Sequence, residues 1–481
     1  MAFLGSTAPG LIVGALICAL TYRFIAHQQE LRANNQIASA KGCLPLRQWN
    51  STWPLGLDLL VQAFRYDRRQ QVLKFFLDVV AKSGTTFEQN LLFSRGVDTI
   101  DPQNIQTLLS TQPDDFGLGL RPPTFLPLLG SGIFTQDGAH WRHSRELLRP
   151  QFMTNQFTNF EQIRSAVDSL ISSIPDDNGV DLQPLFFRLT FETTLFLLIG
   201  NHLPSLQLEG ITGQESDFAN ALNLGQEYLA KRGRLAVQMA LASATNKSRG
   251  TKTEPYIFID ALIEETRNAK VLRDQCLNIL LAGRDTTACC LTWTIRLVVQ
   301  HPHVFFKLRA EISDTVGVGL RSPTPTITQV KSLQYLSLVI KEVLRLYPSV
   351  PGGGPTGTAP ILVRKGEAVG YCVYAMHRRR DIYGADADEF RPERWENDAL
   401  KDVGWGYLPF NGGPRVCLGQ EFALLEVGYT FVRLLQTFEA IEQAEGYRME
   451  KRVGEERQVL TLVISCGEGC VVRMRSYVDE V

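Results

Sequence analysis

Apolar residues recur three and four positions apart over much of the chain beyond residue 60, with polar residues between them. This spacing aligns apolar side chains on one face of an α-helix. It predicts helices over residues 186–200, 258–300, 302–316, 333–347 and 418–436. Runs typical of strands are few and short, and they cover residues 359–363, 368–373 and 459–465. The pattern therefore predicts a mainly α protein with a minor β-sheet.

The apolar stretch over residues 3–22 contains no charged residue. At about 1.5 Å per residue, a helix of this length spans about 30 Å, the thickness of the hydrocarbon core of a membrane. A cleaved signal peptide is the alternative. No basic residue precedes the stretch, however, and the small residues at 38–40 lie too far downstream for a cleavage site. We therefore expect residues 1–26 to form a transmembrane anchor.

The charges that follow this stretch predict its orientation. Arg23, Arg32 and Lys41 follow it, whereas the N-terminal flank carries no charged side chain. The positive-inside rule then places the rest of the chain in the cytosol. Residues 27–60 contain prolines and glycines and are interpreted as a hinge. Residues 61–481 are interpreted as a single catalytic domain, because no Gly/Ser or charged linker divides them.

The charge of the chain is balanced, with 49 Lys and Arg residues against 50 Asp and Glu residues, and its basic runs are short. Nucleic acid is therefore not an expected partner. The nine cysteines are scattered and odd in number, so they do not suit a disulfide framework. Cys466 and Cys470 lack further ligands nearby for a zinc site. We expect the body of the protein in a reducing compartment.

One cysteine, Cys417, stands apart because it lies in the glycine-rich stretch FNGGPRVCLG, directly before an apolar helical pattern. A metal-binding thiolate is stabilised by positive charge, by backbone N–H groups or by a helix N-terminus. Glycines let the backbone approach closely, Arg415 carries charge, and the next helix can point its first N–H groups at the sulfur. A single thiolate in an open site leaves the remaining coordination to a large flat group, which indicates heme.

The positions of Phe410, Gly413, Arg415, Cys417 and Gly419 match in full the cysteine-ligand loop of the cytochromes P-450, the heme-thiolate monooxygenases. The chain resembles this family in four further motifs, which follow one another in the family's order. The resemblance implies the cytochrome P-450 fold and heme b (iron protoporphyrin IX) as the cofactor. It also implies Cys417 as the iron ligand and Phe410, Arg415 and Gly419 as further cofactor-binding residues of the loop.

Two of the further motifs belong to the surroundings of the expected heme. Trp141 and Arg145 resemble the helix that binds a heme propionate, and the stretch LAGRDTT resembles the oxygen-binding central helix. Gly283 in that stretch costs about 1 kcal/mol relative to Ala in a helix, so we interpret its missing side chain as space for dioxygen. Asp285 and Thr286 are consecutive, but a local helix distortion would aim both at one groove. There Thr286 would donate a proton to the oxygen and Asp285 would resupply it from solvent.

Two other motifs concern an ion-pair cluster. Glu342 and Arg345 lie three residues apart on one helix face, and alone they would be a surface pair contributing about 0 to 1 kcal/mol. The stretch from Phe390 to Trp395, which contains Arg394, resembles the strap that completes this pair in the family. The resemblance implies a buried cluster of Glu342, Arg345 and Arg394 with a role in folding rather than in chemistry.

The stretch AGRDTTA, together with FNGGPRVCLGQ and GGGPTG, is similar to the fungal clade that hydroxylates alkanes and fatty acids at terminal or near-terminal carbons. This resemblance implies a lipophilic small-molecule substrate, which suits a membrane protein. No flavin-binding portion follows residue 440, so electrons are expected from a separate NADPH-cytochrome P-450 reductase. The expected location is the endoplasmic reticulum membrane, with a single span and the catalytic domain facing the cytosol.

Two stretches depart from the family. After a segment like that ending at Pro351, the family continues through a strand that lines the pocket and offers an arginine to a heme propionate. Here Gly352 follows directly, and that arginine is missing. The stretch 225–270 is also short, with a roof cut down after Leu235. One alternative is therefore a truncated, poorly active or non-catalytic heme-thiolate protein from an incomplete gene model or a splice variant. A second alternative is an isomerase or dehydratase that needs no dioxygen; the neighbouring acid and alcohol of the AGRDTT stretch argue against it.

Overall fold

The computed structural model describes residues 18, 21–22, 25–26, 28–29, 32–43, 46–49, 53, 56–91, 94–119, 121–154, 156–199, 221–226, 266–351, 363–364, 366–396 and 398–477. The helices within this part are α2 (Leu57–Arg68), α3 (Val72–Ser83), α4 (Pro102–Gln106), α5 (Arg121–Leu129), α6 (Gly138–Thr154), α7 (Gln156–Ser172), α8 (Leu182–Ile199), α11 (Ala269–Gln300), α12 (Pro302–Val316), α13 (Ile327–Ser332), α14 (Gln334–Leu346), α15 (Val373–Met376), α16 (Arg380–Tyr383) and α17 (Gln420–Thr437). Short 3₁₀ or π turns are η2 (Thr107–Thr111), η3 (Pro113–Asp115), η4 (Pro392–Trp395), η5 (Asp398–Leu400), η6 (Gly404–Gly406) and η7 (Gly413–Arg415). The strands are β1 (Arg47–Gln48), β2 (Thr86–Leu91), β3 (Ser94–Thr99), β4 (Gly179–Asp181), β5 (Ala368–Tyr371), β6 (Phe438–Gln443), β7 (Gln458–Leu460), β8 (Ile464–Cys466) and β9 (Val471–Ser476).

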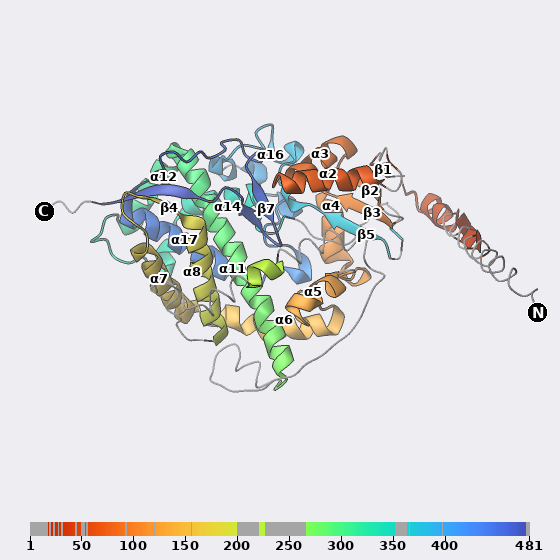
Figure 1. Ribbon diagram of the computed structural model, residues 1–481, viewed down its shortest axis with the longest axis horizontal. Helices are drawn as coiled ribbons and strands as arrows, with labels where there is room; N and C mark the ends of the chain where they lie inside the picture. Colours follow the sequence, from red (N-terminus) through yellow and green to blue (C-terminus); the bar gives the residue numbers. More distant parts are fainter. Residues whose placement is uncertain are drawn as a thin grey trace, which may run out of the picture.

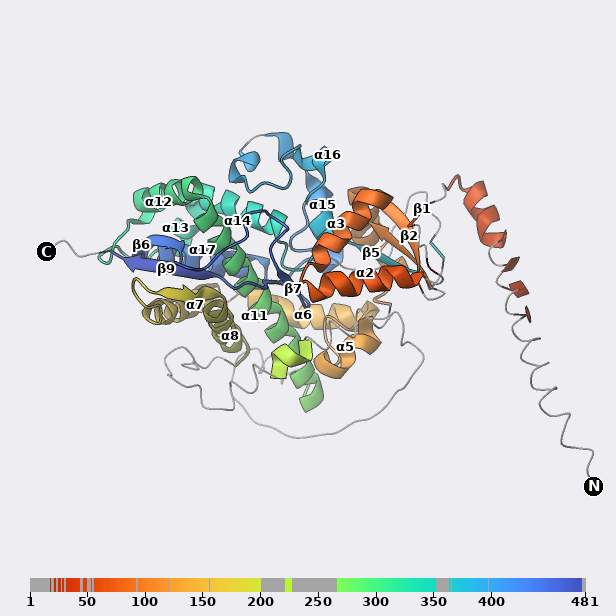
Figure 2. The ribbon, with the colours of Figure 1, turned by 45° about the horizontal axis from the view of Figure 1, so that its top comes forward.

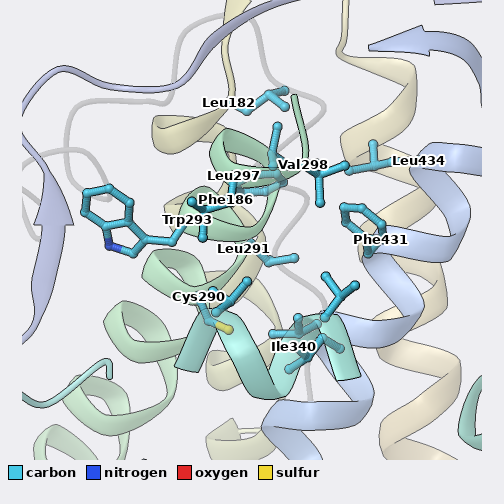
Figure 3. Packing of buried hydrophobic residues seen from close by; sticks show 14 of the residues in the cluster. Leu182, Phe186, Cys290, Leu291, Trp293, Leu297, Val298, Ile340, Phe431 and Leu434 are labelled. Atoms are coloured by element: carbon cyan, nitrogen blue, oxygen red, sulfur yellow. The ribbon is translucent and has the colours of Figure 1, made fainter. Parts of the chain in front are cut away.

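Helix α11 is the central element, and Figure 1 shows it crossing the body of the molecule. The side chain of Asn268 caps its first turn by accepting a hydrogen bond from the N–H of Lys270 (3.0 Å). Every residue of α11 from 287 to 298 is buried, which is the pattern of a helix surrounded on all sides. In Figure 3, Leu291, Leu297 and Val298 of α11 point toward side chains of α8, α14 and α17, and together they form the main core.

The strands form three small sheets at the periphery. One has the order β1-β2-β3-β5, the second β4-β9-β6, and the third pairs β7 with β8. In the first sheet β3 pairs in parallel with β5, so that Thr99 lies opposite Tyr371 despite their distance along the chain. Figure 2 shows this sheet with α2 and α3 at one end of the molecule, whereas α7, α8, α12 and α17 lie at the other.

The helices predicted from apolar spacing are confirmed as α8, α11, α12, α14 and α17 within the described residues. The strand predicted over 459–465 is wrong as a single element. The chain reverses there, with the N–H of Thr461 bonded to the carbonyl of Val463 (3.1 Å), and β7 and β8 pair as a hairpin. The run contains no glycine or proline to mark a turn. The strand predicted over 368–373 ends earlier, because α15 begins at Val373.

Several expectations concern residues outside the described part of the chain. This group contains most of the stretch 1–26, the stretch GGGPTG and nearly all of the shortened roof. It also contains the strand expected over 359–363, up to residue 362. A search of the helices in the described part finds none with the length and apolar character needed to cross a membrane.

Candidate active site

The loop that carries Cys417 is closed by its own backbone. The N–H of Cys417 donates to the carbonyl of Phe410 (2.9 Å), across the turn formed by η7. Gly413 has φ +64, and a Cβ placed on it would lie 1.9 Å from the carbonyl oxygen of Leu109. Only glycine fits there, because any side chain would collide with backbone. Gly419 caps the start of α17, so the cysteine lies just before a helix N-terminus.

The side chain of Cys417 is exposed. The protein around the loop nevertheless raises the pKa of the thiol by burial. A hydrogen bond from the backbone of Gly419 and the positive charge of Arg145 act in the opposite direction and lower the thiol pKa. The cation that lowers the pKa of the thiol is therefore Arg145. The sequence spacing had indicated Arg415 instead.

Arg415 has other partners. Its Nη2 donates to Oδ1 of Asp137 (2.5 Å) and to the carbonyl of Gln136 (3.2 Å). Its guanidinium lies 4.4 Å from the ring centroid of Trp141, and the guanidinium of Arg145 lies 5.8 Å from the same centroid. The structure thus brings Trp141 and Arg145 of α6 together with Arg415 of the cysteine loop. Their role in binding heme stays a prediction.

These residues fit heme. The exposed sulfur of Cys417 would bind the iron, and the propionates of heme would need cationic donors beside it. Arg145 is a suitable donor because its side chain makes no hydrogen bond or ion pair with any residue in the described ranges, apart from its contact with Trp141.

Gly283 has a packing role that the sequence did not indicate. A Cβ on Gly283 would lie 2.5 Å from Oγ1 of Thr194, on α8. The glycine therefore lets α8 pack closely against α11. The interpretation of its missing side chain as space for dioxygen stays a prediction.

Asp285 and Thr286 lie on an unbroken part of α11, so the expected local distortion is absent among the described residues. Asp285 is buried, and burial raises its pKa. Its Oδ1 accepts from Nη1 of Arg284 (3.1 Å), which also donates to Asn223 (2.6 Å). The hydroxyl of Thr286 is partly exposed and donates to the carbonyl of Ala282 (2.7 Å). The acid and the alcohol are neighbours, but each has its own partner.

Glu342, Arg345 and Arg394 meet in a closed, buried cluster. Arg345 donates two hydrogen bonds to the carboxylate of Glu342, each 2.8 Å long, and both residues are fully buried. Arg394 donates to the same carboxylate from Nε (2.8 Å), and Trp395 donates from its indole N–H (2.9 Å). The other N–H groups of the Arg345 guanidinium donate to backbone carbonyls, including that of His377 (2.8 Å). This is not a surface ion pair.

His377 is a residue that sequence reasoning missed. It lies in the run HRRRD, which had been interpreted only as a short basic stretch, but its side chain is fully buried. Its Nε2 accepts from the N–H of Leu408 (2.8 Å), and its Nδ1 lies 3.1 Å from the carbonyl of Arg345. Burial and the charge of Arg345 lower its pKa to about 3, so the ring is neutral. It connects the cluster of Glu342 to the segment that leads into the cysteine loop.

Glu426 of α17 is a second missed residue, with no sequence signal beyond an acid in an apolar helix. It is fully buried, and Thr193 of α8 donates to its Oε1 (2.5 Å). Burial raises its pKa to about 8, while hydrogen bonds from Thr193 and Thr287 act in the opposite direction. Its Oε2 has no hydrogen-bond partner.

Comparison with known proteins agrees with this geometry. The family model described as "Cytochrome P450" matches residues 53–453. The chain is 62% identical to a cytochrome P450 of Arthroderma benhamiae, over 97% of this chain and 99% of that protein. It is 37% identical to cytochrome P450 52A13 of Debaryomyces hansenii, over 90% of this chain and 91% of that protein. A crystal structure of a cytochrome P450 heme domain shares the fold, with a TM-score of 0.71 over 90% of this chain and 98% of that chain at 19% identity.

Proposed function

Because the chain belongs to the cytochrome P450 family of heme-thiolate monooxygenases, we propose that it hydroxylates long-chain aliphatic substrates, n-alkanes or fatty acids, at a terminal or near-terminal carbon. One observation carries this substrate class. The stretches AGRDTTA and FNGGPRVCLGQ resemble the fungal alkane and fatty-acid hydroxylating clade. Three relatives named cytochrome P450 52A, from yeasts of the genera Debaryomyces and Candida, are 39 to 41% identical to the chain.

The proposal assigns a role to each site residue. Bound heme supplies the activation of dioxygen, from which one oxygen atom enters the substrate. Cys417 holds the iron through its sulfur, Phe410, Gly413 and Gly419 shape its loop, and the cations nearby hold the propionates. Thr286 is the proton donor on the oxygen side, because its hydroxyl is partly exposed and can rotate away from the carbonyl that it bonds. Asp285 resupplies that proton after its contact with Arg284 opens.

The test of this chemistry is a reconstitution of the protein with an NADPH-cytochrome P-450 reductase and a series of n-alkanes and fatty acids. Thr286→Val removes only the hydroxyl, and we expect product per NADPH to fall by about 100- to 10,000-fold while hydrogen peroxide rises. Thr292→Val is the matched control, since Thr292 makes the same hydrogen bond to the carbonyl four residues earlier but is fully buried in the core. A protein with an intact carbon monoxide spectrum that oxidises none of these chains would overturn the substrate class.

The membrane arrangement is part of the same proposal. Residues 1–26 anchor the protein in the endoplasmic reticulum membrane, residues 27–60 form the hinge, and residues 61–481 form the monooxygenase domain on the cytosolic side. A separate reductase on that side supplies electrons. Deletion of residues 1–26 should leave the carbon monoxide spectrum intact and lower membrane association. Full-length protein that washes off membranes at high pH would contradict the anchor.

A second candidate is a poorly coupled or non-catalytic heme-thiolate protein. The alignment with the Arthroderma relative favours it. This alignment spans 507 positions, whereas this chain has 481 residues. The relative therefore carries residues that have no counterpart here. A loosely held substrate lowers the rate, since misplacement by about 1 Å costs about 100-fold. The same reconstitution separates the two candidates, because efficient and tightly coupled hydroxylation by the unmodified chain would exclude the second.

A further inference from the structure

Ser349 joins parts of the fold that lie far apart in the sequence. It follows the end of α14 and is half-buried. Its hydroxyl donates to the backbone carbonyl of Thr286 on α11 (3.0 Å), and its own carbonyl accepts from the N–H of Ile464 on β8 (3.2 Å). One residue therefore connects the central helix with the hairpin of β7 and β8.

The backbone around Ser349 is held from both sides. The ring of Tyr347 stacks on that of Trp293 of α11, with centroids 3.9 Å apart and an angle of 4° between the ring planes. The carbonyl of Pro351 accepts from the N–H of Tyr374 of α15 (3.0 Å). Neither contact involves the side chain of Ser349, so its replacement should leave the path of this segment unchanged.

The hairpin contacts α11 at two further places. The indole N–H of Trp293 donates to the carbonyl of Ile464 (3.0 Å). At the turn of the hairpin, Leu462 packs against a cluster that includes Leu281 of α11. Along α11, Leu281 precedes Thr286 and Trp293 follows it. The hairpin is thus fixed to the central helix before and after the proposed proton donor, and Ser349 supplies the contact at the donor itself.

The bond from Ser349 acts on the helix turn that carries the proton donor. The hydroxyl of Thr286 donates to the carbonyl of Ala282 (2.7 Å), and it must rotate away to donate a proton elsewhere. This rotation is productive only if the backbone of the turn stays in place. A carbonyl oxygen has two lone pairs, so that of Thr286 can accept from Ser349 in addition to the bond within the helix.

We propose that Ser349 is a positioning residue, which holds the turn of Thr286 against the hairpin of β7 and β8 and so directs the hydroxyl of Thr286 to the oxygen side. This inference rests on the proposed function, because it takes Thr286 as the proton donor.

The first test measures the tether in the heme-bound protein, by hydrogen exchange of backbone amides. Ser349→Ala removes only the hydroxyl. Local opening of residues 459–466 should become about 2- to 10-fold more frequent, the range for one hydrogen bond between uncharged groups. Ser349→Thr keeps the hydroxyl and should restore slow exchange. Unchanged exchange in Ser349→Ala would overturn the proposal.

Ser173→Ala is the matched control for this test. Ser173 is also half-buried and donates to a backbone carbonyl near a helix end, that of Leu170 on α7 (2.7 Å). It should leave the exchange of residues 459–466 as in the wild type.

The second test asks whether Ser349 acts through Thr286. In the reconstituted system, Ser349→Ala should lower product per NADPH by about 2- to 10-fold and raise hydrogen peroxide, with the carbon monoxide spectrum intact. The double variant should yield the same product per NADPH as Thr286→Val, because removal of the donor leaves Ser349 nothing to position. Effects that multiply in the double variant would overturn the proposal.

The outcome can be separated from that of the proposed function. If the wild type oxidised none of the alkanes and fatty acids, the substrate class would be wrong. Hydrogen exchange and peroxide per NADPH would still decide the role of Ser349. If Thr286→Val released no more peroxide than the wild type, the proton role of Thr286 would be wrong, and the positioning role of Ser349 with it.

Discussion

Two groups of arginines in this protein differ in how their charges are satisfied. In the first, Arg345 and Arg394 surround Glu342, and all three residues are buried with partners in the chain. In the second, Arg415 is paired with Asp137, while Arg145 acts on Cys417 and has no counter-ion in the described residues. The first group is complete as soon as the polypeptide folds. Under the proposed heme binding, an anionic ligand completes the second.

The comparison teaches how to separate folding residues from cofactor residues. Burial does not separate them, since Arg145 is partly buried as well. Compensation separates them, because a buried charge persists in a fold only with partners. The neutral ring of His377 contacts the carbonyl of Arg345 and the N–H of Leu408, so it links the first group to the segment before the cysteine loop.

The largest expected effect concerns the ligand-dependent group. Cys417→Ser should abolish the red-shifted carbon monoxide band completely, because the thiolate is the source of that band. Unfolding of the heme-free protein should change by less than about 0.5 kcal/mol, since the side chain of Cys417 is exposed and lies outside the core. Cys43→Ser is the control and should keep the band. A Cys417→Ser protein with the band intact would remove the second group from the heme site.

The next effect concerns the self-contained group. Glu342→Gln leaves Arg345 buried without a carboxylate, while Arg394 keeps only Asp386 (3.3 Å), which should cost about 3 to 5 kcal/mol of unfolding free energy. Because the polypeptide alone completes this cluster, the loss should be equal with and without heme. Denaturant unfolding of both forms measures it. Glu389→Gln is the matched control, since only the backbone carbonyl of Glu389 contacts Arg345 (3.0 Å). A loss seen only with heme would erase the distinction between the groups.

The smallest expected effect concerns Glu426. Its carboxyl group is buried but uncharged, so it needs neither a partner in the chain, as the first group has, nor a ligand, as the second requires. Its pKa is about 8 in the folded protein, against an ordinary value of 4.5. The folded state therefore keeps a proton that the unfolded state has lost, and stability falls as pH rises from about 4.5 to about 8. Between about pH 6 and pH 8 the fall should be about 2 to 3 kcal/mol.

Glu426→Gln keeps an acceptor for Thr193 and cannot ionise, so its unfolding free energy should stay flat over that interval. Unfolding of the heme-free protein at several pH values measures the difference. Glu421→Gln, an exposed residue of the same helix, should retain the slope of the wild type. An unchanged slope in Glu426→Gln would show that another group titrates.

Much of the fold could be predicted from the sequence because the signals are local. Apolar spacing placed α12 and α17 within about two residues of their bounds, and the spacing of Glu342 and Arg345 placed them on one helix face. The chemistry of Cys417 was also local, since its glycines, its helix and its loop lie within ten residues. The hairpin of β7 and β8 was missed because its turn carries no local signal.

What the tertiary structure decided depends on neighbours that are distant in sequence. Gly283 meets Thr194 of another helix, so its role could not be inferred from the cost of a glycine in α11 alone. The run HRRRD showed in the sequence only as a short basic stretch, whereas the fold buries His377. Asp137 and Arg415 form an ion pair although 278 residues of chain separate them. Periodicity and turn chemistry act over a few residues, whereas the compensation of a charge depends on every group that the fold places around it.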